Sequence, residues 1–167
     1  MKIIITGAYA IGTYLARLLS RNQEELTIID NDEERLDRIG SDYDLLIVQG
    51  SPCSVKTLKE AGAGDTDLFI AVTPDENENI NSCIIAHALK AKKTVAMVND
   101  DEYMEENVLH MYKELGVDEL IYPETLAARE IINGLKMSWV RQRWDVHDGA
   151  LVMLGIKMRE GSEILDR

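Results

Sequence analysis

Short runs of apolar residues alternate along this chain with longer segments of helical periodicity. The runs are too short for helices and rich in β-branched residues, which favours strands buried in a parallel sheet. They lie at Lys2–Thr6, Leu26–Ile29, Leu45–Val48, Asp67–Val72, Thr94–Val98 and Glu119–Tyr122. Helices are predicted between them, directly after Gly12 and at Glu33–Ile39, Ser54–Ala61, Glu76–Leu89 and Asn99–Leu115. This alternation predicts an α/β fold, a Rossmann-like, doubly wound, six-stranded parallel sheet.

A different pattern follows the last of these strands. Pro123 pre-sets the start of a helix over Glu124–Met137, whose apolar face carries Ile131, Ile132, Leu135 and Trp139. Such a face needs a partner, for example another subunit. Ala150–Met158 alternates and predicts a new strand outside the series. We therefore divide the chain into residues 1–122, a helix and linker at 123–144, and the start of a second domain at 145–167.

The turn after the first strand has the outline of a dinucleotide-binding motif. Gly7, Ala8, Tyr9, Ala10, Ile11 and Gly12 match G-x-G-x-x-G, except that Tyr9 replaces the middle glycine. The first glycine would make the tight turn, and the third would let helix and strand pack closely. The following helix N-terminus offers N–H groups to a phosphate. A purely structural turn is the alternative, because a tyrosine side chain occupies space that the pyrophosphate needs.

An acidic residue stands where a ribose would be bound. Asp30 ends the second strand about 20 residues beyond the turn, where a carboxylate accepts hydrogen bonds from ribose hydroxyls in NAD rather than NADP. Asn31 and Asp32, which follow it, can instead begin the next helix, and both roles are compatible. Turn and acid together favour nucleotide binding.

Other strands of the series end in residues that can face the same ligand. Gly50 and Ser51 follow the third strand, where they offer a backbone N–H and a hydroxyl or form a simple turn. Thr73, Pro74 and Asn77 follow the fourth. Ligands of open α/β sheets bind beyond the carboxyl ends of the strands, so these residues are candidates to line the site.

Composition restricts the partners and the compartment. The net charge is −12, which disfavours nucleic acid and anionic membrane surfaces, because phosphate binding depends on clustered Lys and Arg. The two cysteines, Cys53 and Cys83, form neither a metal spacing nor a disulfide framework, which fits a reducing cytoplasm. No signal peptide and no membrane span are expected, so any membrane role is exerted from the cytosol.

No catalytic residue and no metal site are predicted. The histidines at 87, 110 and 147 lack the partners of a nucleophilic or metal-binding motif. The acidic cluster at residues 100–102 favours a helix cap over a cation site. Binding without chemistry is the simplest account. The alternative is a small NAD-dependent oxidoreductase, although little chain remains for a substrate domain.

The chain as a whole resembles the TrkA N-terminal domains, also called RCK or KTN domains, of bacterial Trk-type potassium uptake. The resemblance rests on the glycine turn together with IIDNDEERL, VQGSP, DLFIAVTPDENEN, KKTVAMV, LGVDELIYPE and MSWVRQRW. The terminal ALVMLGIKMREGSEIL is similar to the opening of the family's C-terminal domain, so the chain is expected to be a fragment of a longer subunit.

The resemblance implies a cytosolic regulatory subunit, peripheral to the inner face of the membrane, docked on a membrane-embedded potassium transporter. NAD, NADH, ATP, ADP or AMP would shift its conformation and so gate transport. The ligand would lie over residues 7–12, with Asp30 and Asn31 on the ribose side and Gly50, Ser51, Thr73 and Pro74 around it. Family members form homodimers or higher homo-oligomers, with the helix that corresponds to Glu124–Met137 crossing to the partner.

Two departures from the family pattern fall on phosphate recognition. Tyr9 replaces the middle glycine, and Met97 stands where the family usually has an arginine that reaches the ligand. Loss of a bidentate phosphate donor weakens binding by about 1.5–3 kcal/mol, or roughly ten- to a hundredfold. We therefore expect weak dinucleotide binding, a preference for a ligand with less phosphate such as AMP, or a nucleotide-free structural role.

Overall fold

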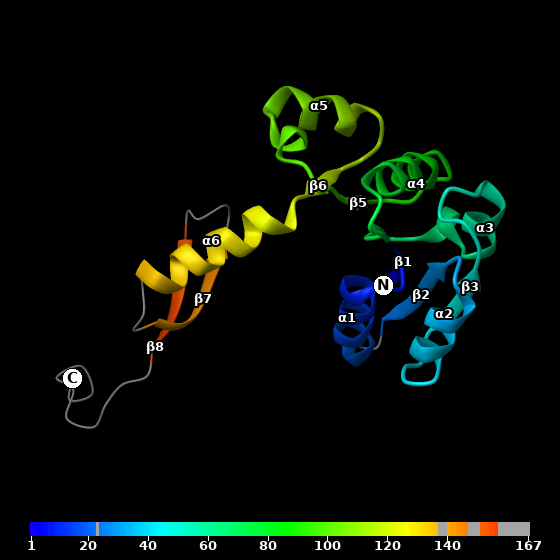
Figure 1. Ribbon diagram of the computed structural model, residues 1–167, viewed down its shortest axis with the longest axis horizontal. Helices are drawn as coiled ribbons and strands as arrows, with labels where there is room; N and C mark the ends of the chain where they lie inside the picture. The colour runs from blue at the N-terminus through cyan, green and yellow to red at the C-terminus, as the bar shows by residue number, and fades with distance from the viewer. Residues whose placement is uncertain (23, 137–139, 147–150, 157–167) are drawn as a thin grey trace. The chain divides into compact units, whose positions relative to one another are not determined.

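The computed structural model describes residues 1–22, 24–136, 140–146 and 151–156. The chain divides into two compact units, Met1–Pro123 and Glu124–Arg167 (Figure 1). No helix among the described residues is both long enough and apolar enough to cross a membrane.

The first unit is built on one parallel sheet, as predicted. Its six strands are arranged in the order β3-β2-β1-β4-β5-β6. They are β1 (Lys2–Thr6), β2 (Glu25–Asp30), β3 (Leu46–Gln49), β4 (Leu68–Ala71), β5 (Thr94–Met97) and β6 (Glu119–Ile121). The helices are α1 (Ala10–Leu19), α2 (Glu33–Gly40), α3 (Val55–Glu60), α4 (Glu76–Ala88) and α5 (Glu106–Glu114). Because β1 pairs with both β2 and β4, the chain reverses its direction across the sheet beside β1.

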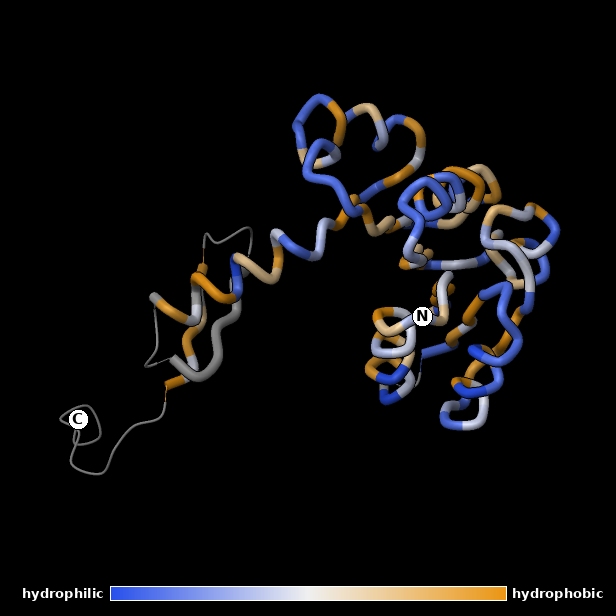
Figure 2. Tube along the Cα trace, viewed as in Figure 1, coloured by the Kyte–Doolittle hydropathy of each residue, from blue (hydrophilic) through white to orange (hydrophobic). Residues whose placement is uncertain are grey.

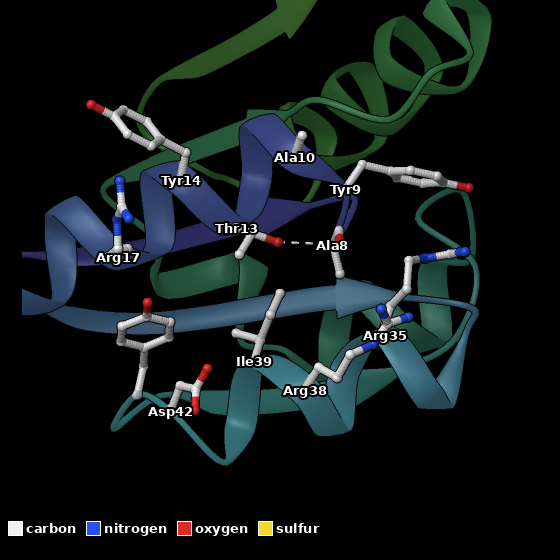
Figure 3. A pocket seen from close by; sticks show the side chains of 11 residues that line it. Ala8, Tyr9, Ala10, Thr13, Tyr14, Arg17, Arg35, Arg38, Ile39 and Asp42 are labelled. Carbon is white, nitrogen blue, oxygen red and sulfur yellow. Dashed lines mark hydrogen bonds between the residues drawn. The ribbon is translucent and has the colours of Figure 1, made fainter.

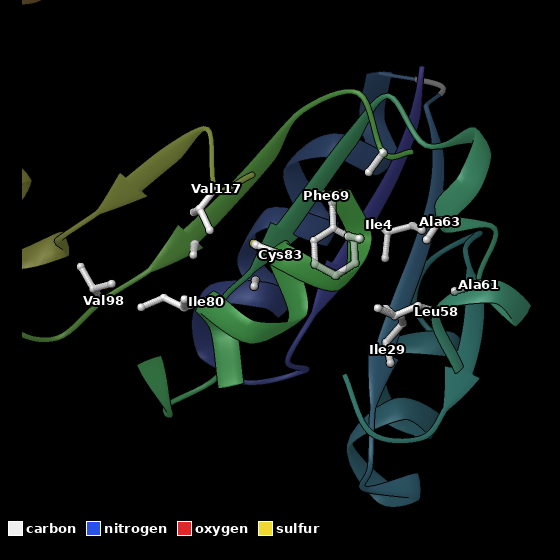
Figure 4. Packing of buried hydrophobic residues seen from close by; sticks show 14 of the residues in the cluster. Ile4, Ile29, Leu58, Ala61, Ala63, Phe69, Ile80, Cys83, Val98 and Val117 are labelled. Atoms are coloured by element: carbon white, nitrogen blue, oxygen red, sulfur yellow. The ribbon is translucent and has the colours of Figure 1, made fainter. Parts of the chain in front are cut away.

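Helices cover both faces of this sheet. On one face, α1 and α2 pack on Ile3 and Ile5 of β1 and on Leu26 and Ile28 of β2. The opposite face, shown in Figure 4, carries Phe69, which is fully buried and packs with residues of α3 and α4. Since neighbouring residues of β1 point to opposite faces and both faces are buried, the strands are continuous apolar runs rather than alternating ones.

The segment predicted as one helix over Asn99–Leu115 is instead broken in two. A 3₁₀ helix spans Asp101–Met104, and α5 begins only at Glu106. Between them Glu105 has an extended backbone, with ψ of 137°. Tyr103 is buried in the core beside Tyr112, at a ring-centroid distance of 5.7 Å. Burial of this aromatic side chain outweighs continuous helical periodicity, which explains the difference.

The turn between β1 and α1 depends on two close approaches. Gly7 has a φ of +96°, a conformation that side chains rarely adopt. Gly12, in the first turn of α1, lies so close to Gly7 that an added Cβ would stand 1.9 Å from the Gly7 carbonyl oxygen. These two glycines therefore bring the N-terminus of α1 against the end of β1.

In its described residues, the second unit consists of one helix and a two-stranded antiparallel sheet. The helix, α6, spans Pro123–Lys136, and its tube in Figure 2 carries hydrophobic residues among hydrophilic ones. The strands are β7 (Val140–Val146) and β8 (Leu151–Ile156). β8 lies within the strand expected at Ala150–Met158. β7 occupies residues 140–144, which we assigned to a linker, and residues 145–146, which we assigned to the second domain. Trp139, which was placed on the apolar face of this helix, lies outside the described residues.

The packing around Gly12 predicts a large effect of a single added carbon. We expect Gly12→Ala to lower the free energy of unfolding by about 2–3 kcal/mol, because α1 must shift away from Gly7. Gly64→Ala is the matched control, since its Cβ would meet only the Leu89 carbonyl oxygen at 3.4 Å. Urea unfolding of the two variants measures the difference, and equal midpoints would contradict this view of the turn.

Candidate functional site

The predicted site residues lie at one edge of the sheet, where the parallel strands have their carboxyl ends. Residues 7–9 follow β1, Asp30 ends β2 and Asn31 follows it. Gly50 and Ser51 follow β3, Thr73 and Pro74 come after β4, and Met97 ends β5. The fold thus gathers positions that are far apart in the sequence at the edge where α/β sheets bind ligands.

Only some of these residues line a common space. A cavity of about 30 Å³ is bounded by Tyr9, Asp30, Asn31, Pro52, Thr73 and Glu78. Small-molecule sites usually occupy about 300–1,000 Å³, so this cavity is too small to enclose a nucleotide as it stands.

Asp30 is buried, and its carboxylate is fully engaged by the protein itself. Its Oδ2 accepts a hydrogen bond of 2.7 Å from the backbone N–H of Ala8, and its Oδ1 accepts one of 2.9 Å from Asp32. The guanidinium of Arg35 donates to Oδ1 at 2.8 Å and to Oδ2 at 3.4 Å. A ribose hydroxyl can bind this carboxylate only by replacing one of these donors.

These donors also set the ionisation of Asp30. Burial by itself raises the pKa of the carboxyl, but the hydrogen bonds from Arg35, Ala8 and Asp32 outweigh it. The net result is a pKa below the ordinary value of 3.8. The carboxylate is therefore charged at neutral pH, which suits an acceptor of ribose hydroxyl groups.

Tyr9, which replaces the middle glycine, lies on the guanidinium of Arg35. The Arg35 guanidinium carbon is 4.2 Å from the ring centroid, a cation–π contact. Figure 3 shows the Tyr9 ring directed toward Arg35. The backbone of Tyr9 is extended, with φ of −84°, so this position does not require a glycine for its own conformation. Tyr9 therefore holds in place the side chain that occupies Asp30.

The loops after β3 and β4 are fixed by their own hydrogen bonds. The N–H of Gly50 donates to the Asp30 carbonyl oxygen at 2.9 Å. The Ser51 hydroxyl accepts from the N–H of Cys53 at 3.2 Å, and the Thr73 hydroxyl donates to the carbonyl of Asp75 at 3.1 Å. The carbonyl of Pro74 accepts from the Asn99 side chain at 3.0 Å. These loops form defined walls, and their hydroxyl groups already have partners.

Of the predicted residues, only Tyr9, Asp30, Asn31 and Thr73 line the small cavity. Met97 is buried, and it belongs to the hydrophobic cluster on the sheet face that α1 and α2 cover. Ala10 and Ile11 lie in the first turn of α1, where both are exposed.

Asn79 is a structural element of the site that the sequence interpretation did not include. This fully buried side chain on α4 accepts from the N–H of Thr73 at 2.8 Å and donates to the Thr73 and Met97 carbonyls at 2.9 Å. It therefore ties the end of β4 to the end of β5. The sequence does place Asn79 beside Ile80 and Cys83, which are buried residues of α4. A buried amide side chain requires hydrogen-bond partners inside the protein, so this position could have indicated a structural role for Asn79.

Arg35 was also missed, although it follows Asp30 by only five residues. Its N–H donates to the Asp32 carboxylate at 3.1 Å, which confirms that Asp32 caps α2. The capping interaction places the Arg35 side chain beside Asp30, and Arg35 also forms an ion pair of 2.7 Å with the Asp32 carboxylate. An arginine in the first turn of a helix that Asp32 caps was therefore the sequence feature that could have indicated a contact with Asp30.

Among the residues that the structure describes, no three His, Cys, Asp or Glu side chains come together in a group that could hold a metal ion. In the acidic segment after β5, the Asp100 carboxylate accepts from the N–H of Glu102 at 3.0 Å, at the start of the 3₁₀ helix. This contact is a helix cap, in keeping with the interpretation that we favoured.

A family model and a curated relative both match this chain to the same protein family. The model of the TrkA-N domain family matches residues 3–123. The Trk system potassium uptake protein TrkA of Haemophilus influenzae is 39% identical over 133 residues, which cover 78% of this chain. The chain spans only 29% of the length of that relative.

Solved structures share the fold at low sequence identity. The TrkA-N domain of the inner membrane protein ybaL from Escherichia coli superposes with a TM-score of 0.70 at 18% identity, over 80% of this chain and 96% of that one. The Shewanella denitrificans Kef CTD in its AMP-bound form gives a TM-score of 0.63 at 23% identity, over 83% and 82%. At these identities the likeness establishes the fold.

The lowered pKa of Asp30 predicts a pH-dependent contribution to stability. A carboxylate whose pKa is lower in the folded than in the unfolded chain stabilises the fold above pH 3.8, and this stabilisation is lost as the pH falls through the folded value. We expect Asp30→Asn to cost about 2–3 kcal/mol at neutral pH, with a smaller difference from the unmodified chain below pH 3.8. Urea unfolding over this pH range measures the difference in the free energy of unfolding between Asp30→Asn and the unmodified chain, and Asp37→Asn, at an exposed position, is the control. If the difference does not change with pH, the lowered pKa of Asp30 is contradicted.

Proposed function

The chain belongs to the TrkA-N domain family, and we propose that it is the nucleotide-sensing part of a regulatory subunit for potassium uptake. An adenine nucleotide would bind at the carboxyl edge of the sheet and alter the conformation of the subunit. That change would be relayed to a membrane-embedded potassium transporter, with the subunit on the cytoplasmic side. The observation that carries this proposal is the charged, buried Asp30 beside the glycine turn.

The ribose hydroxyls would bind Asp30 by replacing Arg35. Both carboxylate oxygens are engaged in the described structure, and the Ala8 and Asp32 N–H groups belong to the folded backbone. The Arg35 side chain, held by a 2.8 Å hydrogen bond and by the Tyr9 ring, is the donor that can swing away. Its departure would enlarge the small cavity, and the released guanidinium could then contact the ligand.

This exchange gives a physical route to regulation. A ligand shifts a conformational equilibrium only if it binds the two states unequally. The state with Arg35 on Asp30 has a cavity of about 30 Å³, too small to enclose a nucleotide, whereas the open state would accept it. Arg35 belongs to α2 and Tyr9 caps α1, so the exchange would act on the start of both helices.

The similar proteins support a regulatory rather than an enzymatic role. The Haemophilus relative is a potassium uptake protein, and the Shewanella structure holds AMP. These properties belong to those proteins, and they make AMP the first ligand to test here. We keep a nucleotide-free scaffold as the second candidate function, because the engaged Asp30 and the small cavity are also what a domain without a ligand would show.

We also propose that the subunit is a homodimer or a higher homo-oligomer through α6. Ile131, Ile132 and Leu135 recur at helical spacing on this helix and are exposed, with 77% of Leu135 accessible. An apolar face of this kind on a soluble helix is typical of a subunit interface.

The exchange of Arg35 predicts the effect of changing Tyr9. We expect the unmodified chain to bind AMP at the Asp30 cavity, and Tyr9→Gly to bind it there about tenfold more tightly, because the variant loses both a cavity wall and the contact that holds Arg35. Isothermal titration calorimetry with AMP, ADP, ATP, NAD and NADH measures this. Tyr9→Phe is the control, since it keeps the ring. No saturable binding of any of the five ligands would rule out the sensor and leave the scaffold.

The second consequence concerns oligomeric state. We expect Leu135→Asp to convert the dimer to a monomer, because it places a charge in the apolar interface. Arg129→Gln changes the net charge of α6 by the same amount and should leave the dimer intact. Light scattering coupled to size-exclusion chromatography distinguishes the two species. If both variants keep the mass of the unmodified chain, α6 is not the interface.

A further inference from the structure

We propose that the groove between α1 and α2 is a second ligand site, separate from the nucleotide cavity, for a small phosphorylated compound that carries a planar ring. The groove lies on the sheet face that these two helices cover (Figure 3), and no residue of the loops after β3 and β4 lines it. It has a volume of about 520 Å³, within the usual range of small-molecule sites. Its existence does not depend on nucleotide binding at Asp30.

The lining of this groove combines arginine and aromatic side chains. The residues are Ala8, Tyr9, Ala10, Thr13, Tyr14, Arg17, Arg35, Arg38, Ile39, Asp42 and Tyr43. In Figure 3, α1 contributes one wall and α2 the facing wall. Arg35 is neutralised by its ion pairs with Asp30 and Asp32, so the groove keeps two cationic side chains, Arg17 and Arg38, beside one anionic side chain, Asp42. In a chain whose net charge is −12, this local excess of cationic side chains favours an anionic ligand.

Two of the three arginines retain donors for a ligand. Arg35 is committed to Asp30 and Asp32 through its ion pairs. Arg38 donates its Nε to the carbonyl of Glu34 at 3.1 Å, and the guanidinium carbon of Arg17 lies 4.8 Å from the centroid of the Tyr14 ring. Neither Arg17 nor Arg38 forms an ion pair with any residue in the described part of the chain. A guanidinium has five N–H donors in a planar fork, which matches the oxygens of a phosphate.

The remaining walls suit a planar ring. Ile39 is buried at the base of the groove, whereas Tyr14 is half exposed at its rim. Arg17 on the Tyr14 ring shows that this rim already supports a stacking contact. Apolar and aromatic walls with a few charged groups are typical of small-molecule sites, and the limited volume favours such a ligand over a protein segment.

Tyr9 and Arg35 stand between this groove and the nucleotide cavity. Tyr9 lines both spaces, and Arg35 lines the groove while it binds Asp30. The two sites nevertheless depend on different residues, since Arg17 and Arg38 do not line the cavity at Asp30. Substitution of these two arginines therefore tests the groove alone.

The experiment is a titration of the whole isotope-labelled chain followed by nuclear magnetic resonance, with inorganic pyrophosphate, AMP and adenosine as probes. We expect saturable shifts of the Nε–H signals of Arg17 and Arg38 and of the amide of Thr13 with AMP and pyrophosphate, tighter for AMP. Adenosine, which has no phosphate, should leave these signals unchanged.

The double variant Arg17→Gln with Arg38→Gln should bind AMP in the groove at least about tenfold more weakly. Lys56→Gln with Lys59→Gln on α3 removes the same charge and should bind normally.

The outcomes separate this site from the proposed function. Shifts at the amides of Asn31, Thr73 and Glu78 report the nucleotide cavity, because these residues line it and do not line the groove, and they should persist in the double arginine variant. If pyrophosphate shifts Arg17 and Arg38 while no nucleotide affects Asn31, Thr73 or Glu78, the groove is supported and the sensor fails. No saturable shift at Arg17 or Arg38 overturns the groove site, as does equal binding by the double variant. Occupation by a hexaglutamate peptide but not by AMP or pyrophosphate also overturns it, because the occupant is then a protein segment.

Discussion

One buried carboxylate joins the parts of the first unit that surround the site. Asp30 is 3% exposed and accepts hydrogen bonds from the glycine turn, from the start of α2 and from the Arg35 side chain. A buried charge without such partners is strongly destabilising, so the turn after β1 and the first turn of α2 must keep their places around it. The close approach of Gly12 to Gly7 then sets the N-terminus of α1 at the same edge. This single constraint fixes the geometry on which both proposed sites depend.

The same carboxylate is also the acceptor that a ribose would need. Folding and ligand binding therefore compete for it, and Arg35 is the side chain through which they compete. The Tyr9 ring favours the folded, ligand-free arrangement by holding Arg35. In this account Tyr9 matters less as an obstacle to phosphate than as a support for Arg35. The adjoining groove, with Arg17 and Arg38, offers phosphate a second place to bind on the same domain.

Much of the fold could be predicted, because a strand that is buried on both faces of a sheet is visible in the sequence as a short run of apolar residues. The Asp32 cap and the position of Asp30 at the end of β2 were likewise local features. The break at Glu105 could not be predicted, because it follows from burial of Tyr103, a tertiary contact. The occupation of Asp30 by Arg35 depends on side chains that meet only in three dimensions. A motif search recognises the residue that would bind the ribose but not the one that already fills its place.

The most direct test of the account is a crystal structure of the chain with AMP. We predict ribose hydroxyls within hydrogen-bonding distance of the Asp30 carboxylate. The guanidinium of Arg35 should then have left Oδ1, from which it is 2.8 Å away in the ligand-free chain. AMP bound while the Asp30–Arg35 pair remains intact, or AMP without contact to Asp30, would contradict the central claim that nucleotide and arginine exchange on this carboxylate.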